Sequence, residues 1–432
     1  MTQAWSNWSG SVCARPSQIV KPRTEAELAA IVQQATEVRA VGAGHSFMPL
    51  CETNGTLVDL ADLDSPIEIA ADGASAWAPA GWSLKRVTQA LWDLGYSLPN
   101  QGDVNPQSLA GALGTGTHGT GADLGSLATF ARAFRLMLAD GAVVECSETQ
   151  RPDLFQAARL SLGLLGIATR IRVNVLPAFY LREQISRIPF AALLERFDSI
   201  AASHRHAEFF IFPYSDHALL KTLHPAEDDG SFHELSARDE AVFRFCCDVG
   251  AAWPAAIGPL QRWLTRFVPS SRRTGAAHRI FPADRTVPFE EMEYEMPRVA
   301  GMETLQAALR WIREHRLPVT FPLEFRWVAG DDIWLSPFND GPCAAISLHQ
   351  YGKLPWRELF AAVEPIFRAH GGRPHWAKRH LLTAQDLQTL YPQAEKFRAV
   401  RSETDPEAKF ANAHLAGLFD IAPAARRAEH AR

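Results

Sequence analysis

The sequence predicts an α+β fold in two parts, and three observations lead to this prediction. Residues 1–177 alternate short helical and extended segments with turn residues between them. Residues 178–378 contain longer extended segments that alternate with helices, whereas the segment 379–432 is polar and helical. The length of 432 residues and the 47% content of apolar residues suffice for two or three domains with proper cores.

Composition excludes several classes of protein. The net charge of −5 gives no reason to expect nucleic acid or an anionic membrane surface as a partner. No run of 18 apolar residues is present, and the N-terminus lacks the basic and apolar regions of a secretory signal. The six cysteines are scattered and form no zinc pattern, which is typical of buried thiols in a reducing compartment. We therefore expect a cytoplasmic protein without structural metal, disulfide or membrane span.

The elements of the first part follow from capping and periodicity. Thr24 and Glu27 have the spacing of a capping box, which opens a helix that runs to about residue 35. A strand at 38–41 comes next and ends in a glycine-rich turn. The further predicted elements are strands at 56–60, 77–80 and 167–175, helices at 83–94 and 152–161, and a hairpin over 134–145.

The second part is predicted from longer patterns. Strands are expected at 319–328 and 344–351, and helices at 303–315 and 356–370. A sheet with helices of this kind could cover a ligand bound to the first part.

Two glycine-rich loops each contain one histidine. The first is Gly42-Ala43-Gly44-His45-Ser46, directly after the strand at 38–41; the second runs from Gly114 through His118 to Gly121. Glycine permits positive φ and close approach, so that backbone N–H groups can face a phosphate or another anion. Isolated glycine pairs are also ordinary turns. The two loops together suggest a large cofactor held from two sides.

The second loop also matches G-x-G-x-x-G over residues 114–119. That pattern indicates a dinucleotide site only between a strand and a helix. The preceding residues 108–113 are too small and too rich in glycine for a good strand, and residues 120–123 are a poor helix start. A nicotinamide site of the Rossmann type is therefore disfavoured.

Polar residues on the two predicted strands of the second part can form a binding or catalytic site. Because side chains alternate along a strand, Glu324 and Arg326 share one face, and the apolar residues between and around them share the other. By the same alternation Ser347 and His349 share a face, so that His349 would lie near Glu324 and Arg326 if the two strands pair. A surface ion pair and a structural histidine are the plain alternatives.

One cation and two histidines follow the last predicted helix of the second part. Lys378 is either a surface cation or a fixed positive charge in a binding site. His375 and His380 do not indicate zinc, because no third ligand lies at a plausible spacing.

A set of short motifs occurs in a specific order along nearly the whole chain. The motifs are Trp5-Ser-Asn-Trp8-Ser-Gly10, Val41-Gly-Ala-Gly-His45-Ser46, Gly111-Ala-Leu-Gly-Thr-Gly-Thr-His118-Gly119-Thr-Gly121, Glu324-Phe-Arg326, His375-Trp-Ala-Lys378, Phe397-Arg-Ala-Val-Arg401, Asp405-Pro406 and Phe410-Ala-Asn412. With these motifs in this order, the chain resembles the vanillyl-alcohol-oxidase type of FAD flavoproteins, and more narrowly the sugar-lactone and alditol oxidases.

This resemblance implies a PCMH-type FAD-binding module of two subdomains, made by residues 1–177 and completed by the returning segment 379–432. It also implies a substrate cap over 178–378 that is built on an antiparallel sheet. FAD is expected to be attached covalently through His45. The residues implied to bind the cofactor are Gly42, Ala43, Gly44, His45, Ser46, Gly102, Asp103, Ser108, Gly111, Gly114, Thr115, Gly116, Thr117, His118, Gly119, Gly121, Gly166, Ile167 and Lys378.

The resemblance further implies catalytic roles for Glu324, Arg326, His349 and Lys378. The expected reaction is hydride transfer from a carbinol carbon of a sugar lactone or polyol to flavin N5. His349 is the expected base, while Arg326 and Lys378 polarise the oxygen and the flavin. Dioxygen is the expected acceptor and hydrogen peroxide the product. The alternatives are a dehydrogenase that uses a quinone or cytochrome, and a flavin-binding protein without catalysis.

The chain departs from alditol oxidase at several positions. Asp103 stands where that enzyme has a serine that contacts the polyol, Glu291 replaces a substrate-binding glutamine, and Ala377 replaces a glycine. These changes favour the lactone group. Gly102, a small residue beside the flavin, favours access of dioxygen. The oligomeric state, the particular sugar and its stereochemistry are not predicted.

Overall fold

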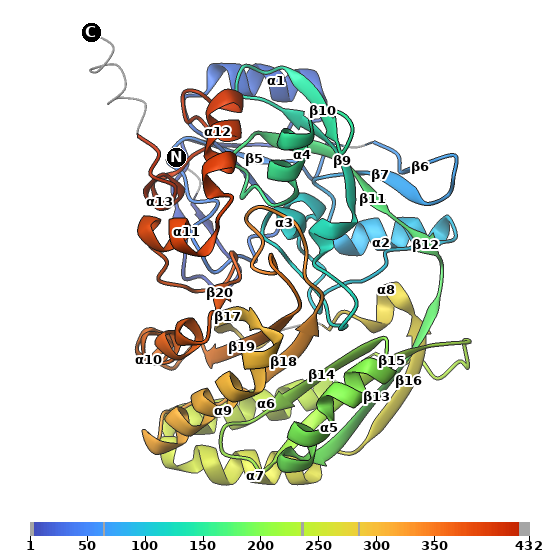
Figure 1. Ribbon diagram of the computed structural model, residues 1–432, viewed down its shortest axis with the longest axis vertical. Coiled ribbons are helices and arrows are strands. Elements are labelled where there is room, and N and C mark those ends of the chain that lie inside the picture. Colours follow the sequence, from blue (N-terminus) through green and yellow to red (C-terminus); the bar gives the residue numbers. More distant parts are fainter. Residues whose placement is uncertain (1–3, 64, 235–236, 284–285, 423–432) are drawn as a thin grey trace.

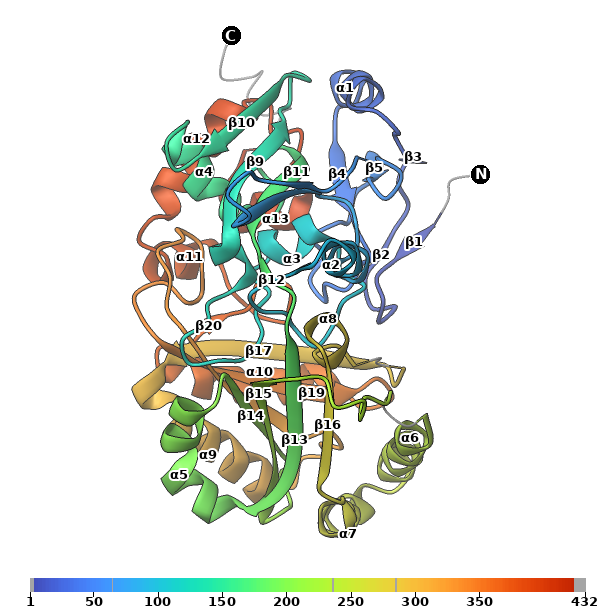
Figure 2. The same ribbon diagram turned by 90° about the vertical axis from the view of Figure 1, so that its right-hand side faces the viewer.

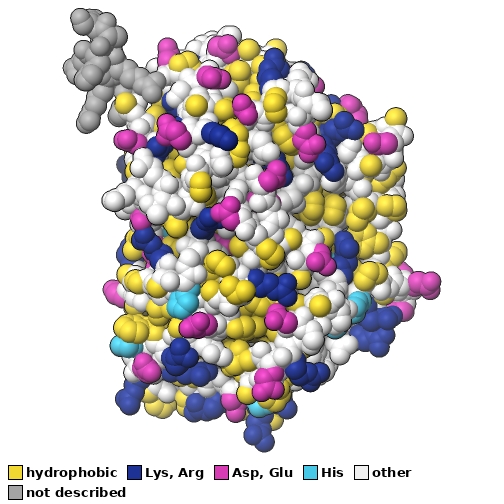
Figure 3. Space-filling model, viewed as in Figure 1, with side chains coloured by type: hydrophobic (Ala, Val, Ile, Leu, Met, Phe, Trp, Pro, Cys, Tyr) yellow, Lys and Arg dark blue, Asp and Glu magenta, His cyan; other side chains and the backbone are white. Residues whose placement is uncertain are grey.

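The structure is a computed structural model that describes residues 4–63, 65–234, 237–283 and 286–422. The chain forms two modules that lie one above the other in Figure 1. The described strands from β1 (Trp5–Ser6) to β12 (Leu176–Pro177) belong to the first module, and those from β13 (Tyr180–Pro189) to β20 (Arg373–Pro374) belong to the second. The C-terminal segment returns to the first module, as its red ribbon shows (Figure 1). Both signs of charge are interspersed over the face drawn in Figure 3.

The first module contains two main sheets. The smaller one is parallel, in the order β3-β5-β4, and is covered by α1, which buries Leu28 and Val32. Its elements are β3 (Gln18–Val20), β4 (Val38–Val41), β5 (Thr56–Asp59) and α1 (Glu25–Gln34). Thr24 caps α1 as predicted by accepting a hydrogen bond from the Glu27 N–H, but the Glu27 carboxylate accepts from the Arg23 N–H rather than from Thr24.

The larger sheet of the first module is antiparallel in the order β10-β9-β11-β7-β6, with helices beside it. The remaining elements of this module are β1 (Trp5–Ser6), β2 (Cys13–Ala14), β6 (Glu68–Ile69), β7 (Ser75–Pro79), α2 (Leu84–Asp93), β8 (Tyr96–Ser97), α3 (Leu109–Gly114), β9 (Ala131–Met137), β10 (Val143–Ser147), α4 (Pro152–Arg159), β11 (Ile167–Asn174) and β12 (Leu176–Pro177). Every strand and helix predicted for this module is present, with ends that differ by a few residues.

The second module is built on an antiparallel sheet whose described strands follow the order β16-β13-β15-β14-β18-β19-β17-β20. Helices α5, α9 and α10 cover one face and bury its apolar side chains in a single core. Figure 2 shows the sheet between these helices and the first module. The elements are β13 (Tyr180–Pro189), α5 (Phe190–Ser203), β14 (His206–Ile211), β15 (His217–Ala226), α6 (Ala237–Ala252), α7 (Ile257–Phe267), β16 (Ser271–Ala276), α8 (Ala277–Ile280), β17 (Phe289–Pro297), α9 (Arg298–Glu314), β18 (Leu323–Val328), β19 (Cys343–Tyr351), α10 (Trp356–Ala369) and β20 (Arg373–Pro374).

The alternation of side chains sorts this sheet into an apolar and a polar face. On β18, Leu323, Phe325 and Trp327 enter the core beneath the helices, whereas Glu324 and Arg326 face the first module. The strand is shorter than the predicted 319–328, and α9 begins five residues before the predicted helix at 303. None of the helices in the described part of the chain is both long and apolar enough to cross a bilayer.

The C-terminal segment completes the first module. Its helices α11 (Ala384–Leu390), α12 (Ala394–Thr404) and α13 (Ala413–Leu418) pack into the core of that module. The ammonium of Lys409 is buried and donates to the carbonyls of Val32 and Ala139, at 2.7 and 2.9 Å. Arg39 in turn donates to the carbonyl of Phe410. These buried charged groups join the C-terminal segment to the first module.

Candidate active site

Two adjoining cavities form the candidate site, and Lys378 lines both of them. The first is a long cleft inside the first module, and the second lies between the first module and the polar face of the second. We refer to them as the cleft and the basin. Lys378 stands where they meet because it follows β20, at the point where the chain leaves the second module.

The cleft is lined by the first glycine loop. Gly44 has a φ of +66°, and a Cβ added at Gly42 would lie only 2.4 Å from the Ser108 Oγ, so both positions require glycine. The N–H groups of residues 43–46 donate no hydrogen bond to any described residue. Such a row of free N–H groups suits an anionic group. The cleft therefore offers a place for an anionic group such as the pyrophosphate of FAD.

His45 lies in this cleft without a polar partner among the described residues. Its ring stacks on Trp8 with the centroids 5.6 Å apart. Burial, with a smaller contribution from the positive charge of Lys378, lowers the pKa of His45 to about 4. The imidazole is neutral at pH 7 and keeps a free lone pair, which makes it a potential nucleophile.

The remaining cofactor residues predicted from sequence divide between the two cavities. Gly42, Ala43, Gly44, His45, Ser46, Ser108, Gly111, Gly114, Thr115, Gly166, Ile167 and Lys378 line the cleft. Gly102, Asp103, Thr117 and His118 line the basin instead. Gly116, Gly119 and Gly121 line neither; a Cβ at Gly119 would meet the carbonyl of Gln101 at 2.1 Å, and Gly121 donates to the Trp327 carbonyl across the module boundary.

The structure also explains why residues 108–113 make a poor strand. They form the short helix α3, with Ser108 at its N-cap accepting from the Gly111 N–H at 3.2 Å. The second glycine loop therefore follows a helix.

The four predicted catalytic residues all line the basin. Strands β18 and β19 pair, with Glu324 opposite Ser347, which brings His349 to the same cavity as Glu324 and Arg326. Lys378 reaches the basin from the other side. The residues that line the basin are Gly102, Asp103, Val104, Gln107, Thr117, His118, Phe289, Glu291, Glu293, Glu324, Arg326, His349, His375 and Lys378.

Glu293 is the centre of this basin, and the sequence prediction missed it. Its buried Oε1 accepts from the Arg326 Nη2 at 2.8 Å and from the His118 Nε2 at 2.9 Å. Burial by itself raises the pKa of this carboxyl, but Arg326 and His118 outweigh burial and hold the pKa well below its usual range. Glu293 is therefore a carboxylate that joins a residue of the first module to a residue of the second.

Both ring nitrogens of His118 face oxygen atoms in this arrangement. Its Nδ1 lies 2.9 Å from the Gly119 carbonyl, and its Nε2 lies 2.9 Å from the Glu293 carboxylate. His118 is thus held on the wall of the basin, although its loop suggested a role at the cofactor.

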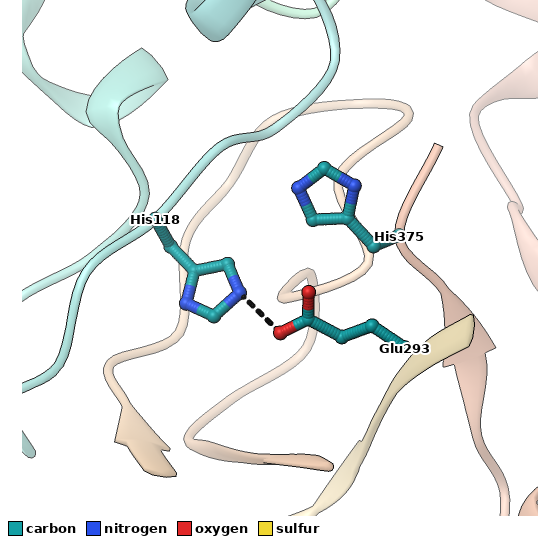
Figure 4. A group of neighbouring side chains, drawn as sticks. All are labelled: His118, Glu293 and His375. Atoms are coloured by element: carbon teal, nitrogen blue, oxygen red, sulfur yellow. Dashed lines mark hydrogen bonds and ion pairs between the residues drawn. The ribbon is translucent and has the colours of Figure 1, made fainter. Parts of the chain in front are cut away.

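The imidazole of His375 is neutral. Its Nδ1 accepts from the Ala377 N–H at 3.1 Å, and burial lowers its pKa to about 3. Figure 4 shows His375 beside His118 and Glu293. The potential ligand atoms of these three residues all lie within 4.8 Å of one another, which is close enough to hold a metal ion. The lone pairs of Glu293 Oε1 are already used by His118 and Arg326, and a metal ion would lie next to the guanidinium. The contacts of Glu293 with His118 and Arg326, and that of His375 with the Ala377 N–H, account for the trio without a metal ion.

A second carboxylate cluster borders the basin and already holds a cation. Asp103, Glu208 and Glu324 approach one another closely, and the buried ammonium of Lys221 lies 2.8 Å from Glu208 and 3.5 Å from Asp103. Lys221 thereby ties the Gly102–Asp103 loop of the first module to β15. Burial raises the pKa of Glu208 to about 8 in spite of Lys221.

Strand β17 presents three glutamates to this side. Burial raises the pKa of Glu291, but Lys378 and His349 outweigh it and lower the pKa; the His349 Nε2 lies 3.3 Å from Glu291. Glu295 differs, because burial and the neighbouring Glu293 raise its pKa well above the usual range. At alternate positions of β17, Glu291 and Glu293 are therefore carboxylates, whereas Glu295 is a protonated acid.

Comparison with known proteins assigns the chain to a family. A profile of the D-arabinono-1,4-lactone oxidase family matches residues 171–418, and one of an FAD binding domain matches residues 16–147. The chain belongs to the D-arabinono-1,4-lactone oxidase family and is an FAD-dependent oxidoreductase.

Individual relatives cover nearly the whole chain. L-gulono-1,4-lactone dehydrogenase of Mycobacterium tuberculosis (strain ATCC 25618 / H37Rv) is 37% identical over 95% of this chain and 98% of its own. L-gulonolactone oxidase of Mus musculus is 29% identical over 96% and 98%, and alditol oxidase of a Streptomyces species is 28% identical over 97% and 100%. The crystal structure of cholesterol oxidase from B. sterolicum shares the fold with a TM-score of 0.82, at 16% identity over 97% of both chains.

Proposed function

We propose that this protein oxidises a sugar-derived aldonolactone, with FAD held in the cleft and the lactone in the basin. The observation that carries the proposal is the position of Lys378 at the junction of the two cavities, with its ammonium on Glu291. The relatives named as acting on L-gulono-1,4-lactone support a lactone in preference to an alditol. Asp103 and Glu291 on the basin wall also favour the lactone, because they stand where alditol oxidase has a serine and a glutamine for its polyol.

Bound FAD supplies the two-electron acceptor that the substrate carbinol carbon needs. Arg326 and Lys378 place two positive charges in the basin, where they bind the substrate hydroxyl and stabilise the negative charge that grows on its oxygen. Each cation lies beside an ionised carboxylate, Arg326 beside Glu293 and Lys378 beside Glu291.

His349 is the proposed base. The Glu291 carboxylate can only accept, so the His349 Nε2 at 3.3 Å carries the ring proton. The Nδ1 is then the nitrogen with the free lone pair, and it is buried without a partner among the described residues. This tautomer can take the hydroxyl proton of the substrate.

Covalent attachment of FAD through His45 is also part of the proposal. Its neutral, unpartnered imidazole on the glycine loop supports this role. Protein precipitated with acid should retain the flavin, and His45→Ala should release it. Free FAD recovered from the wild-type protein after precipitation would contradict the attachment while leaving the oxidation intact.

Dioxygen is the proposed electron acceptor, and a quinone or cytochrome is the second candidate. Gly102 lines the basin and supports dioxygen only through the resemblance to oxidases with a small residue beside the flavin, since a Cβ at Gly102 would point at the His118 carbonyl, 3.0 Å away. The relative named as a dehydrogenase favours the second candidate. The cytoplasm remains the proposed location, since all six cysteines are free thiols.

One experiment separates these proposals. The purified protein is mixed without air with L-gulono-1,4-lactone or, in parallel, with xylitol, and the visible flavin absorbance is followed. Loss of absorbance with the lactone supports the proposed reaction, and loss with neither compound would favour a flavin-binding protein without catalysis. Readmission of air then distinguishes the acceptors, because only an oxidase recovers its absorbance rapidly and releases hydrogen peroxide.

A further inference from the structure

Helix α7 of the second module buries polar residues and exposes large apolar ones, which reverses the usual pattern of a surface helix. Its inner stripe buries Ile257, Gln261 and Thr265, of which two are polar. Its outer stripe carries Trp263 and Phe267, which are 53% and 62% exposed. Surface helices normally bury their large apolar residues and expose their polar ones.

The inner stripe is fixed by specific hydrogen bonds, so the helix is held in this orientation. Gln261 accepts from the Tyr214 N–H at 3.0 Å and donates to the Val319 carbonyl at 2.7 Å. The rings of Trp263 and Phe267 pack on each other, with centroids 5.6 Å apart, and both remain more than half exposed. The exposed rings are therefore a property of the folded state and call for a partner outside the chain.

Basic residues accompany the rings. Arg262 and Arg266 lie one turn apart beside Trp263 and Phe267, and both are exposed. Neither forms an ion pair with a described carboxylate, although Asp216 is near enough to Arg262 for their charges to interact. We call Trp253, Arg262, Trp263, Arg266 and Phe267 the α7 patch.

The sequence around the α7 patch is free of acidic residues. No Asp or Glu occurs over residues 249–283, whereas the same stretch contains five arginines. The positive charge of this stretch contrasts with the net charge of −5 for the whole chain. Figure 3 shows Lys and Arg side chains, with some Asp and Glu among them, along the lower end of the molecule, where Figure 1 places α7.

We propose that the α7 patch binds the surface of an anionic phospholipid bilayer, with the two rings inserted among the headgroups. Tryptophan and phenylalanine next to arginine on one helical face form the usual pattern of helices that lie in a membrane interface. The patch is confined to one helix and the turn before it, which is small for a stable protein–protein interface of 20–30 residues a side. It lies on the outer edge of the second module, away from the cleft (Figure 2).

The test is co-sedimentation of the FAD-loaded full chain with vesicles of phosphatidylcholine alone and of phosphatidylcholine mixed with phosphatidylglycerol. We expect binding to the mixed vesicles, which weakens as salt is raised. The double substitution Arg262→Glu/Arg266→Glu should weaken binding by at least ~10-fold. Trp263→Ser/Phe267→Ser should weaken it by a similar factor.

The matched control is Val299→Ser/Leu381→Ser, which replaces two exposed apolar residues outside the α7 patch and should leave binding unchanged. Retained flavin absorbance and lactone turnover show that each variant is folded. Three results would overturn the proposal: no sedimentation of the wild type with mixed vesicles, equal sedimentation with both kinds of vesicle, or unchanged binding by both patch variants. A dimer in solution that the patch variants dissociate, without vesicle binding, would assign the patch to a second copy of the chain instead.

Discussion

Replacing Glu293 by glutamine tests the proposed charge arrangement of the basin most directly. The substitution keeps the shape of the side chain and removes one negative charge. In the structure that carboxylate pairs with Arg326 and hydrogen-bonds to His118, both of which are buried. Removing one partner of a buried ion pair typically costs about 3–5 kcal/mol, because the other charge remains without compensation. We expect Glu293→Gln to lower the free energy of unfolding by about that amount.

Glu295→Gln provides a control two residues away on the same strand. Glu295 is as buried as Glu293, but its pKa is raised well above the usual range, so the residue is already neutral. Glutamine there is a neutral replacement for a neutral acid, and the free energy of unfolding should change by less than about 1 kcal/mol.

Urea unfolding followed by circular dichroism measures both effects, and anaerobic reduction of the flavin by the lactone measures catalysis. If about 3 kcal/mol of the Glu293 interaction is lost where Arg326 binds substrate, reduction should slow by about 100-fold. Glu295→Gln should reduce at the wild-type rate. Equal destabilisation by the two variants would show that the assigned charge states are wrong.

Three further predictions concern separate parts of the site. Lys378→Met should slow flavin reduction by at least ~10-fold while the protein keeps its flavin, because the junction of the cavities loses its charge; an unchanged rate would remove Lys378 from the mechanism. Gly42→Ala should destabilise the protein by about 1–3 kcal/mol in urea unfolding through overlap with Ser108, and Ser108→Gly in the same chain should recover most of the loss; no recovery would refute the contact. Burial lowers the pKa of His206 from 6.5 to about 3. Between these two pH values the unfolded state binds a proton at His206 that the folded state does not bind. The stability that the neutral imidazole allows above pH 6.5 is therefore lost as the pH falls toward 3. His206→Asn keeps the Nδ1-like donor and should reduce that loss by about 1.4 kcal/mol per pH unit in the same assay, whereas an unaltered pH dependence would contradict the assignment.

Local patterns account for the parts of the fold and site that the sequence predicted. Alternation over residues 323–328 was enough to place Glu324 and Arg326 on one face, because a strand fixes the direction of each side chain without reference to the rest of the chain. The helix caps and the first glycine loop were predictable for the same reason. The roles proposed for these residues stay predictions until the variants are measured.

Long-range register and burial account for what was missed. Glu293 lies 175 residues from His118, and no spacing rule connects them. Whether a strand glutamate is ionised depends on the desolvation and the charges of its final surroundings, which differ between Glu293 and Glu295 although both alternate with apolar residues. That alternation of acidic and apolar residues over 291–296 was the available signal of a strand with a polar, buried face.

The return of the C-terminal segment has a consequence for biosynthesis. Asn412 donates to the carbonyls of Pro49 and Glu52, next to the glycine loop, and Lys409 occupies a buried position in the same module. A nascent chain cannot make these contacts until almost its whole length has left the ribosome. The glycine loop is translated early but is completed only by these late contacts. We therefore expect FAD to bind after synthesis, and a chain shortened before Lys409 to lose FAD even though every residue of the glycine loop is present.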